Sequence, residues 1–171
     1  GQVSLLNLID KCKSFMGVIW FSNQCRGSCI LIGQNLVLTA RHCVAGVYLP
    51  DLTVEFEYLE KRGKRTYQCN HCVESHRYLD FAVLVIEEEP GLVQTPALLE
   101  CSEDPVDRDL PLLHHPSGKP LCVSVHAFGP RDISSRIITN HDTDTGSSGG
   151  AYLNVKGELI GVHLGSDIYC L

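Results

Sequence analysis

The amino-acid sequence predicts an all-β protein, and three observations support this prediction. Short runs of aliphatic, β-branched and aromatic residues recur along the chain, separated by Gly, Asn and Pro. The run at 53–58 alternates apolar and polar residues, which is typical of a half-buried strand. Helical spacing of apolar residues is confined to 4–12. Many short strands without long helices indicate a β-sandwich or β-barrel.

The predicted elements follow one another in a regular order. A short amphipathic helix covers 4–12, where the apolar positions are Leu5, Leu8, Ile9 and Cys12. The predicted strands are 18–21, 29–32, 36–39, 53–58, 79–86, 121–128, 136–139, 151–155 and 159–164. The basic segment 61–65, with a central glycine, is typical of a solvated hairpin tip. The sequence Asn-Val-Lys-Gly at 154–157 predicts the turn between the last two strands.

A break near the middle of the chain suggests two β units. Three glutamates followed by Pro-Gly at 87–91 are typical of an exposed connector. We therefore expect one unit at 1–88, a connector at 89–104 and a second unit at 105–171. A chain of 171 residues is long enough for two small domains that share an interface.

Composition argues against two classes of partner. The formal net charge of −6 differs from the basic footprint of most nucleic-acid-binding proteins. No apolar run approaches the ~20 residues that a membrane-spanning helix needs. We therefore expect neither a nucleic acid nor a membrane as partner.

The cysteines indicate whether the protein is intracellular or secreted. Their number, nine, is odd, and their spacing shows no obvious disulfide framework. Cys29 and Cys122 lie inside apolar strands, which favours reduced, buried thiols in an intracellular protein. The start of the chain also lacks the basic flank and apolar core of a secretion signal. A secreted protein with some disulfides is the second interpretation.

Three residues in separate segments together suggest nucleophilic catalysis. His42 follows one apolar strand, Asp80 opens another, and Ser148 lies in the glycine turn 146–150. A serine hydroxyl becomes a nucleophile when a base is within hydrogen-bond reach and a third group orients that base. Backbone N–H groups of Gly146 and Ser148 could stabilise an oxyanion. Each residue alone has a structural explanation, but their order across an all-β chain predicts a triad.

These segments resemble those of trypsin-like serine proteases, which have the chymotrypsin fold. Residues 38–43 (Leu-Thr-Ala-Arg-His-Cys) resemble Thr-Ala-Ala-His-Cys, and residues 80–84 resemble Asp-Ile-Ala-Leu-Leu. Residues 146–151 resemble Gly-Asp-Ser-Gly-Gly-Pro, and the likeness extends over about residues 18–167. The resemblance implies two six-stranded antiparallel β-barrels, packed perpendicular to each other, with the triad in the cleft between them.

Three positions depart from the pattern of the digestive enzymes. Arg41 replaces a small residue, Ala151 replaces proline, and Ser147 replaces an aspartate. In digestive enzymes that aspartate pairs with the N-terminal amine released when the zymogen is cut. Ser147 cannot form this ion pair, so the resemblance is to intracellular, bacterial and viral members. We expect activity without N-terminal trimming.

Substrate preference is predicted from the last strand. Gly-Val-His at 161–163 is similar to segments of bacterial glutamyl endopeptidases and arterivirus main proteases, where the histidine lines the primary specificity pocket. The resemblance implies that His163 and Thr143 bind the side chain before the cut, and that Gly165 pairs with the substrate backbone. The prediction is Glu or Gln first. Asp142, at the position where trypsin keeps a carboxylate, makes a basic residue the second choice. A structural hydrogen bond in the core is the alternative for His163.

Other clusters give weaker indications. Cys69 and Cys72 have Cys-x-x-Cys spacing with His76 nearby, which is half of a zinc site, and no second pair matches it. His114 and His115 belong to a segment, 114–118, typical of a turn. We therefore expect no metal and no cofactor.

Two function classes remain. The first is an active serine endopeptidase acting on peptides or proteins. The alternative is a trypsin-fold pseudoenzyme that binds a peptide in the cleft between the two barrels without cleaving it. Pseudoenzymes usually lose a triad residue, and this chain retains all three.

Overall fold

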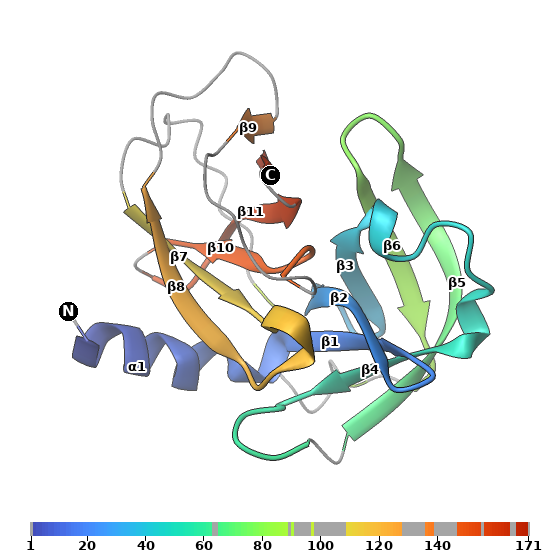
Figure 1. The fold of residues 1–171 in the computed structure, drawn as a ribbon, viewed down its shortest axis with the longest axis horizontal. Coiled ribbons are helices and arrows are strands. Elements are labelled where there is room, and N and C mark those ends of the chain that lie inside the picture. Colours follow the sequence, from blue (N-terminus) through green and yellow to red (C-terminus); the bar gives the residue numbers. More distant parts are fainter. Residues whose placement is uncertain are drawn as a thin grey trace.

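The computed structural model contains two antiparallel β-sheets side by side, with one helix at the N-terminus (Figure 1). It describes residues 2–62, 65–88, 90, 97, 109–127, 136–138, 147–154, 156–164 and 167–170. For 2–6, 109, 126–127, 136–138 and 167–170 it describes the backbone only. The mainly β architecture predicted from the sequence is confirmed.

The strands of the first sheet form a closed barrel in the order β1-β2-β3-β6-β5-β4. Their bounds are β1 Met16–Phe21, β2 Gln24–Leu31, β3 Leu36–Ala40, β4 Leu52–Phe56, β5 Arg65–His76 and β6 Phe81–Ile86. Short 3₁₀ turns cover Lys13–Phe15, Arg41–Cys43 and Leu49–Asp51. The barrel interior is apolar, with Ile19, Val37, Val54, Phe56 and Leu84 fully buried. Burial of such side chains is the main favourable term in folding.

The second sheet also has six strands, in the order β8-β7-β10-β11-β12-β9. Their bounds are β7 Asp109–His114, β8 Cys122–Ala127, β9 Arg136–Ile138, β10 Ala151–Leu153, β11 Leu159–Leu164 and β12 Asp167–Cys170, with a 3₁₀ turn at Pro116–Gly118 between β7 and β8. Six strands in each unit agree with the prediction. The first sheet closes into a barrel, whereas the described strands of the second form an open order.

Three strands were not predicted from the sequence, each for a physical reason. In β5 only Tyr67 and Cys69 are buried, so the strand lacks an apolar run. β7 contains Pro111, which counts against a strand in sequence-based reasoning. β12 is only four residues long. The predicted turn at 114–118 begins with the last residue of β7.

The N-terminal helix α1, Gln2–Cys12, begins two residues earlier than predicted. It extends beneath the second sheet, in blue in Figure 1. Lys11 Nζ donates a hydrogen bond to the carbonyl of Lys156, and Cys12 Sγ lies 3.9 Å from the carbonyl of Gly157. The helix therefore contacts the turn between β10 and β11. Within the described ranges, no helix has both the length and the apolar character needed to cross a bilayer.

The side chains of seven cysteines are described, and all carry free thiols: Cys12, Cys25, Cys29, Cys43, Cys69, Cys72 and Cys122. Of the expected connector, the structure describes Pro90 and Ala97, and both are buried. The backbone N–H of Ala97 donates to the carbonyl of Leu31 at 2.8 Å. These two positions therefore pack against the protein, whereas Glu87 and Glu88, at the start of the segment that the sequence predicts to be exposed, are exposed.

Candidate active site

Strand pairing in the barrel brings His42 beside Asp80. β3 and β6 are antiparallel, and Ala40, the last residue of β3, pairs with Phe81, the first residue of β6. The chain therefore leaves β3 where it enters β6, although the two segments are 38 residues apart. The backbone N–H of Arg41 donates to the carbonyl of Asp80 at 2.8 Å.

Two hydrogen bonds join His42 to the Asp80 carboxylate. The ring atom Nδ1 lies 2.5 Å from Oδ2, and the backbone N–H of His42 donates to Oδ1 at 2.9 Å. Asp80 has a φ of +57°, a region that Asp adopts more readily than most residues. The His42 side chain is 51% exposed and that of Asp80 is 21% exposed. The carboxylate is thus the inner partner, and the imidazole is accessible from solvent.

The turn that carries Ser148 is held by tight packing against the barrel. Gly149 has a φ of +88°, and a Cβ atom there would lie 1.9 Å from the carbonyl oxygen of Ser28. Its backbone N–H donates to the carbonyl of His163 at 2.7 Å, and the N–H of His163 donates to the carbonyl of Gly150 at 2.9 Å. Glycine is required at 149 because both the backbone angle and the space exclude a side chain.

Ser28 connects the two sheets at this point. Its backbone N–H donates to the carbonyl of Ser148 at 2.7 Å, and its carbonyl accepts a hydrogen bond from the Thr39 hydroxyl at 2.8 Å. Its own hydroxyl accepts the backbone N–H of His115 at 2.9 Å. Ser28 was not predicted as a site residue from the sequence. The available signal was a small polar residue directly before the apolar run 29–32.

The carbonyl of Ser148 also lies 3.8 Å from Sγ of Cys43, the residue after His42. Gly27 permits this approach, because a Cβ there would lie 2.6 Å from that sulfur and 2.9 Å from the Ser148 carbonyl oxygen. The structure therefore places the Ser148 turn next to the turn that carries His42. Burial raises the pKa of Cys43 to about 12, so its thiol stays protonated at neutral pH and is a poor nucleophile.

A buried polar chain lies behind the Ser148 turn. Ser147 Oγ lies 2.7 Å from Nδ1 of His114, and Nε2 of His114 lies 3.2 Å from Ser124 Oγ. The register explains the contact, since Leu113 pairs with Ala151 and so puts His114 opposite the glycines. The sequence analysis assigned no role to His114. A histidine at the end of an apolar strand was the signal that could have revealed it.

His163 lies in β11 and is fully buried. Its Nδ1 atom lies 2.8 Å from the hydroxyl of Tyr152, and the two rings meet edge to face with centroids 5.6 Å apart. Burial raises the pKa of the Tyr152 hydroxyl, so this group remains protonated at all ordinary pH values. Through its backbone bonds to Gly149 and Gly150, His163 is also part of the framework of the Ser148 turn.

Four predicted site residues, Gly146, Thr143, Asp142 and Gly165, lie outside the described residues. The two thiols of the Cys-x-x-Cys pair do not lie together, because Cys69 is buried in the core and Cys72 is exposed. In the part of the chain that the structure describes, no three His, Cys, Asp or Glu side chains gather as metal ligands would.

Solved structures share this fold. The chain is similar to Deg5, with a TM-score of 0.77 at 20% identity, covering 99% of this chain and 89% of that one. It is similar to a serine endoprotease from Yersinia pestis, with a TM-score of 0.76 at 18% identity, covering 96% of this chain and 61% of that longer chain. A Glu endopeptidase gives a TM-score of 0.72 at 17% identity, with coverage of 92% and 84%.

The sequence itself identifies the family. No curated protein sequence matches the chain significantly. A family model described as a trypsin-like peptidase domain, however, matches residues 27–162, which is most of the chain and includes both segments around His42 and Ser148. The chain therefore belongs to the family of trypsin-like peptidase domains, and its enzyme class is that of a serine endopeptidase.

Proposed function

We propose that this chain hydrolyses peptide bonds with Ser148 as nucleophile, His42 as general base and Asp80 as the residue that orients the base. The 2.5 Å contact between Nδ1 of His42 and Oδ2 of Asp80 carries the proposal. A carboxylate accepts a hydrogen bond from Nδ1–H, so the neutral imidazole keeps its proton on Nδ1 and its lone pair on Nε2. That atom can take the proton of a serine hydroxyl.

The reaction follows from these roles. Ser148 Oγ bonds to the carbonyl carbon of the substrate while its proton moves to Nε2 of His42. His42 then gives the proton to the leaving nitrogen as the C–N bond breaks. Water repeats the sequence and releases the carboxylic acid and free Ser148. Backbone N–H groups of Gly146 and Ser148 would bind the oxyanion, and each such donor is worth about 3 kcal/mol.

For specificity, we propose Glu or Gln on the amino side of the cut. His163 supports this choice because Tyr152 can donate its hydroxyl proton to Nδ1 of the ring, which places the ring proton on Nε2. An imidazole N–H can then bind a carboxylate or amide oxygen of the substrate, aided by Thr143. Asp142 would favour a basic residue instead, and Gly165 would pair with the substrate backbone. The fold suits either preference.

Labelling by a fluorophosphonate probe tests the triad. We expect stoichiometric modification of Ser148 in the wild-type chain and none in S148A. D80N should label about 10⁴-fold more slowly, because the wrong histidine tautomer is then stabilised. A wild-type chain that is folded by circular dichroism but remains unlabelled would instead favour the peptide-binding pseudoenzyme.

Cleavage of a mixed peptide library tests the specificity. We expect Glu or Gln before most cuts, and Y152F should weaken this preference because His163 loses the group that sets its tautomer. D142N is the matched control, since removal of a carboxylate should not reduce cleavage after Glu. A dominant Arg or Lys preference that disappears in D142N would overturn the ranking.

A further inference from the structure

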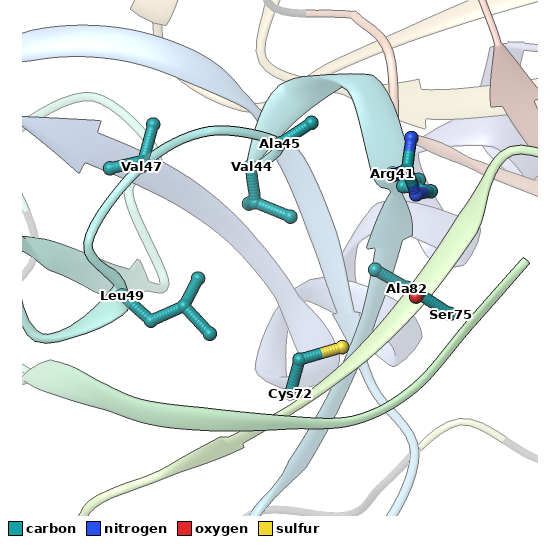
Figure 2. Close-up of a pocket in the computed structure, with 8 residues that line it drawn as sticks. All are labelled: Arg41, Val44, Ala45, Val47, Leu49, Cys72, Ser75 and Ala82. Carbon is teal, nitrogen blue, oxygen red and sulfur yellow. The ribbon is translucent and has the colours of Figure 1, made fainter. Parts of the chain in front are cut away.

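A pocket lies on the barrel beside the turn that carries His42 (Figure 2). Its volume is about 180 Å³. Figure 2 shows Val47 and Leu49 at one end and Arg41 at the other. The lining residues are Arg41, Val44, Ala45, Val47, Leu49, Cys72, Ser75 and Ala82. None of them belongs to the catalytic residues proposed above.

Five of the eight lining residues are aliphatic: Val44, Ala45, Val47, Leu49 and Ala82. Val44 and Ala82 are buried, and Val47 and Leu49 are half-buried, so an apolar group that enters would contact aliphatic side chains. A cavity of roughly 150 Å³ lined by aliphatic side chains holds a benzene-sized molecule. The pocket therefore has room for one aliphatic or aromatic side chain.

Arg41 gives the pocket a positive end. Among the described residues, none of the ion pairs includes Arg41, so no carboxylate is paired with its guanidinium. No acidic residue lines the pocket either. An unneutralised guanidinium favours a carboxylate, which it binds with two parallel N–H···O bonds.

Exposed apolar side chains lie near some of the lining residues in the sequence. Among the described residues, four large apolar side chains are strongly exposed, and three of them are Tyr48 (71%), Val73 (52%) and Tyr78 (67%). Tyr48 lies between two lining residues in sequence, and Val73 directly follows another.

We propose that this pocket is an exosite for a peptide segment of a partner protein, in which an aliphatic or aromatic side chain lies next to an acidic one. The apolar side chain would enter between Val47 and Ala82, and the carboxylate would pair with Arg41. Because Arg41 begins the turn that holds His42, the exosite lies next to the catalytic base but uses different residues.

Cys72 provides a local reporter of occupancy, because its thiol is exposed and lines the pocket. The assay measures the rate of Cys72 alkylation by iodoacetamide in S148A, with peptide mass spectrometry as readout. The probe is N-acetyl-Leu-Glu-amide at millimolar concentration. We expect alkylation to slow at least threefold. The partly buried thiol of Cys122, in the second sheet, is the control and should react at an unchanged rate.

Matched probes and one variant make the test specific. N-acetyl-Leu-Gln-amide, without the charge, and N-acetyl-Gly-Glu-amide, without the apolar side chain, should protect Cys72 much less. R41M should lose protection by the acidic probe. Absence of protection in S148A, equal protection by all three peptides, or protection that survives in R41M would each overturn the exosite. Since S148A cannot form an acyl-enzyme, this result is independent of fluorophosphonate labelling, which tests the proposed catalytic function.

Discussion

Ser147 Oγ and His114 Nδ1 form a buried contact of 2.7 Å directly before the proposed nucleophile. Ser147 stands where digestive trypsin-like enzymes have the aspartate that pairs with a new N-terminus. In this chain a neutral hydroxyl and an imidazole occupy that place, and both come from the second sheet or its turn. The Ser148 turn is thus anchored by a contact that the folded chain already contains.

We expect S147A to lower kcat about tenfold with little change in KM for a short peptide. The substitution removes one partner of a buried hydrogen bond, which costs about 1–3 kcal/mol, and a tenfold rate change corresponds to about 1.4 kcal/mol. Steady-state kinetics with one peptide substrate measures both constants. S124A, which removes the longer 3.2 Å contact, should have the smaller effect. An unchanged kcat in S147A would show that the contact does not position the turn.

An N-terminal extension should leave activity intact. Because Ser147 cannot pair with a terminal ammonium, a tag fused before Gly1 should change kcat/KM by no more than about twofold. The measurement compares tagged and untagged chains on one substrate. Complete inactivation by the tag, reversed on its removal, would contradict this expectation.

Gly149 should tolerate no side chain. G149A places a Cβ 1.9 Å from the Ser28 carbonyl oxygen at a φ of +88°, so we expect a stability loss above the ~1–3 kcal/mol of backbone strain alone. Gly46 is the matched control, because its φ is +75° and nothing lies within 4 Å of its Cβ position. G46A should therefore lose only the part of the free energy of unfolding that comes from backbone strain. Urea unfolding of both variants measures the difference, and equal losses would rule out the steric contribution.

Stability should fall in mild acid because of His115. Burial lowers the pKa of this imidazole from the ordinary 6.5 to about 4. Between these values the unfolded chain binds a proton at this position and the native chain does not, so the free energy of unfolding decreases as the pH falls. No stability is lost at this site above about pH 6.5, and the loss reaches about 3 kcal/mol by pH 4.

H115F isolates this effect. The ring stacks on Tyr58, and Nδ1 contacts the carbonyl of Lys119 at 2.9 Å, so the variant should be less stable at pH 7. Its free energy of unfolding should nevertheless depend less on pH between 6.5 and 4. Urea titrations at several pH values, on the wild type and H115F, give the slope of the free energy of unfolding against pH for each protein. Parallel slopes would show that His115 does not carry the acid sensitivity.

The sequence patterns predicted the β class, nine of the twelve described strands and the segments around His42, Asp80 and Ser148, whereas six strands in each unit were implied by the resemblance to trypsin-like serine proteases. Local pattern was sufficient there because short apolar runs and a glycine turn have few alternative structures. The patterns missed β5, in which only Tyr67 and Cys69 are buried, β7, which contains Pro111, and β12, which is only four residues long. The Cys69–Cys72 spacing suggested half a metal site, but the strand directs one thiol to the core and leaves the other exposed.

Only the tertiary structure decided which distant side chains meet. The pairing of Ala40 with Phe81 brings His42 to Asp80, and the pairing of Leu113 with Ala151 brings His114 to Ser147. Neither contact follows from local sequence, because each depends on strand register between segments far apart in the chain. The residues of the glycine turn were recognisable in the sequence, whereas their anchoring by Ser28 and His114 required the packed sheets.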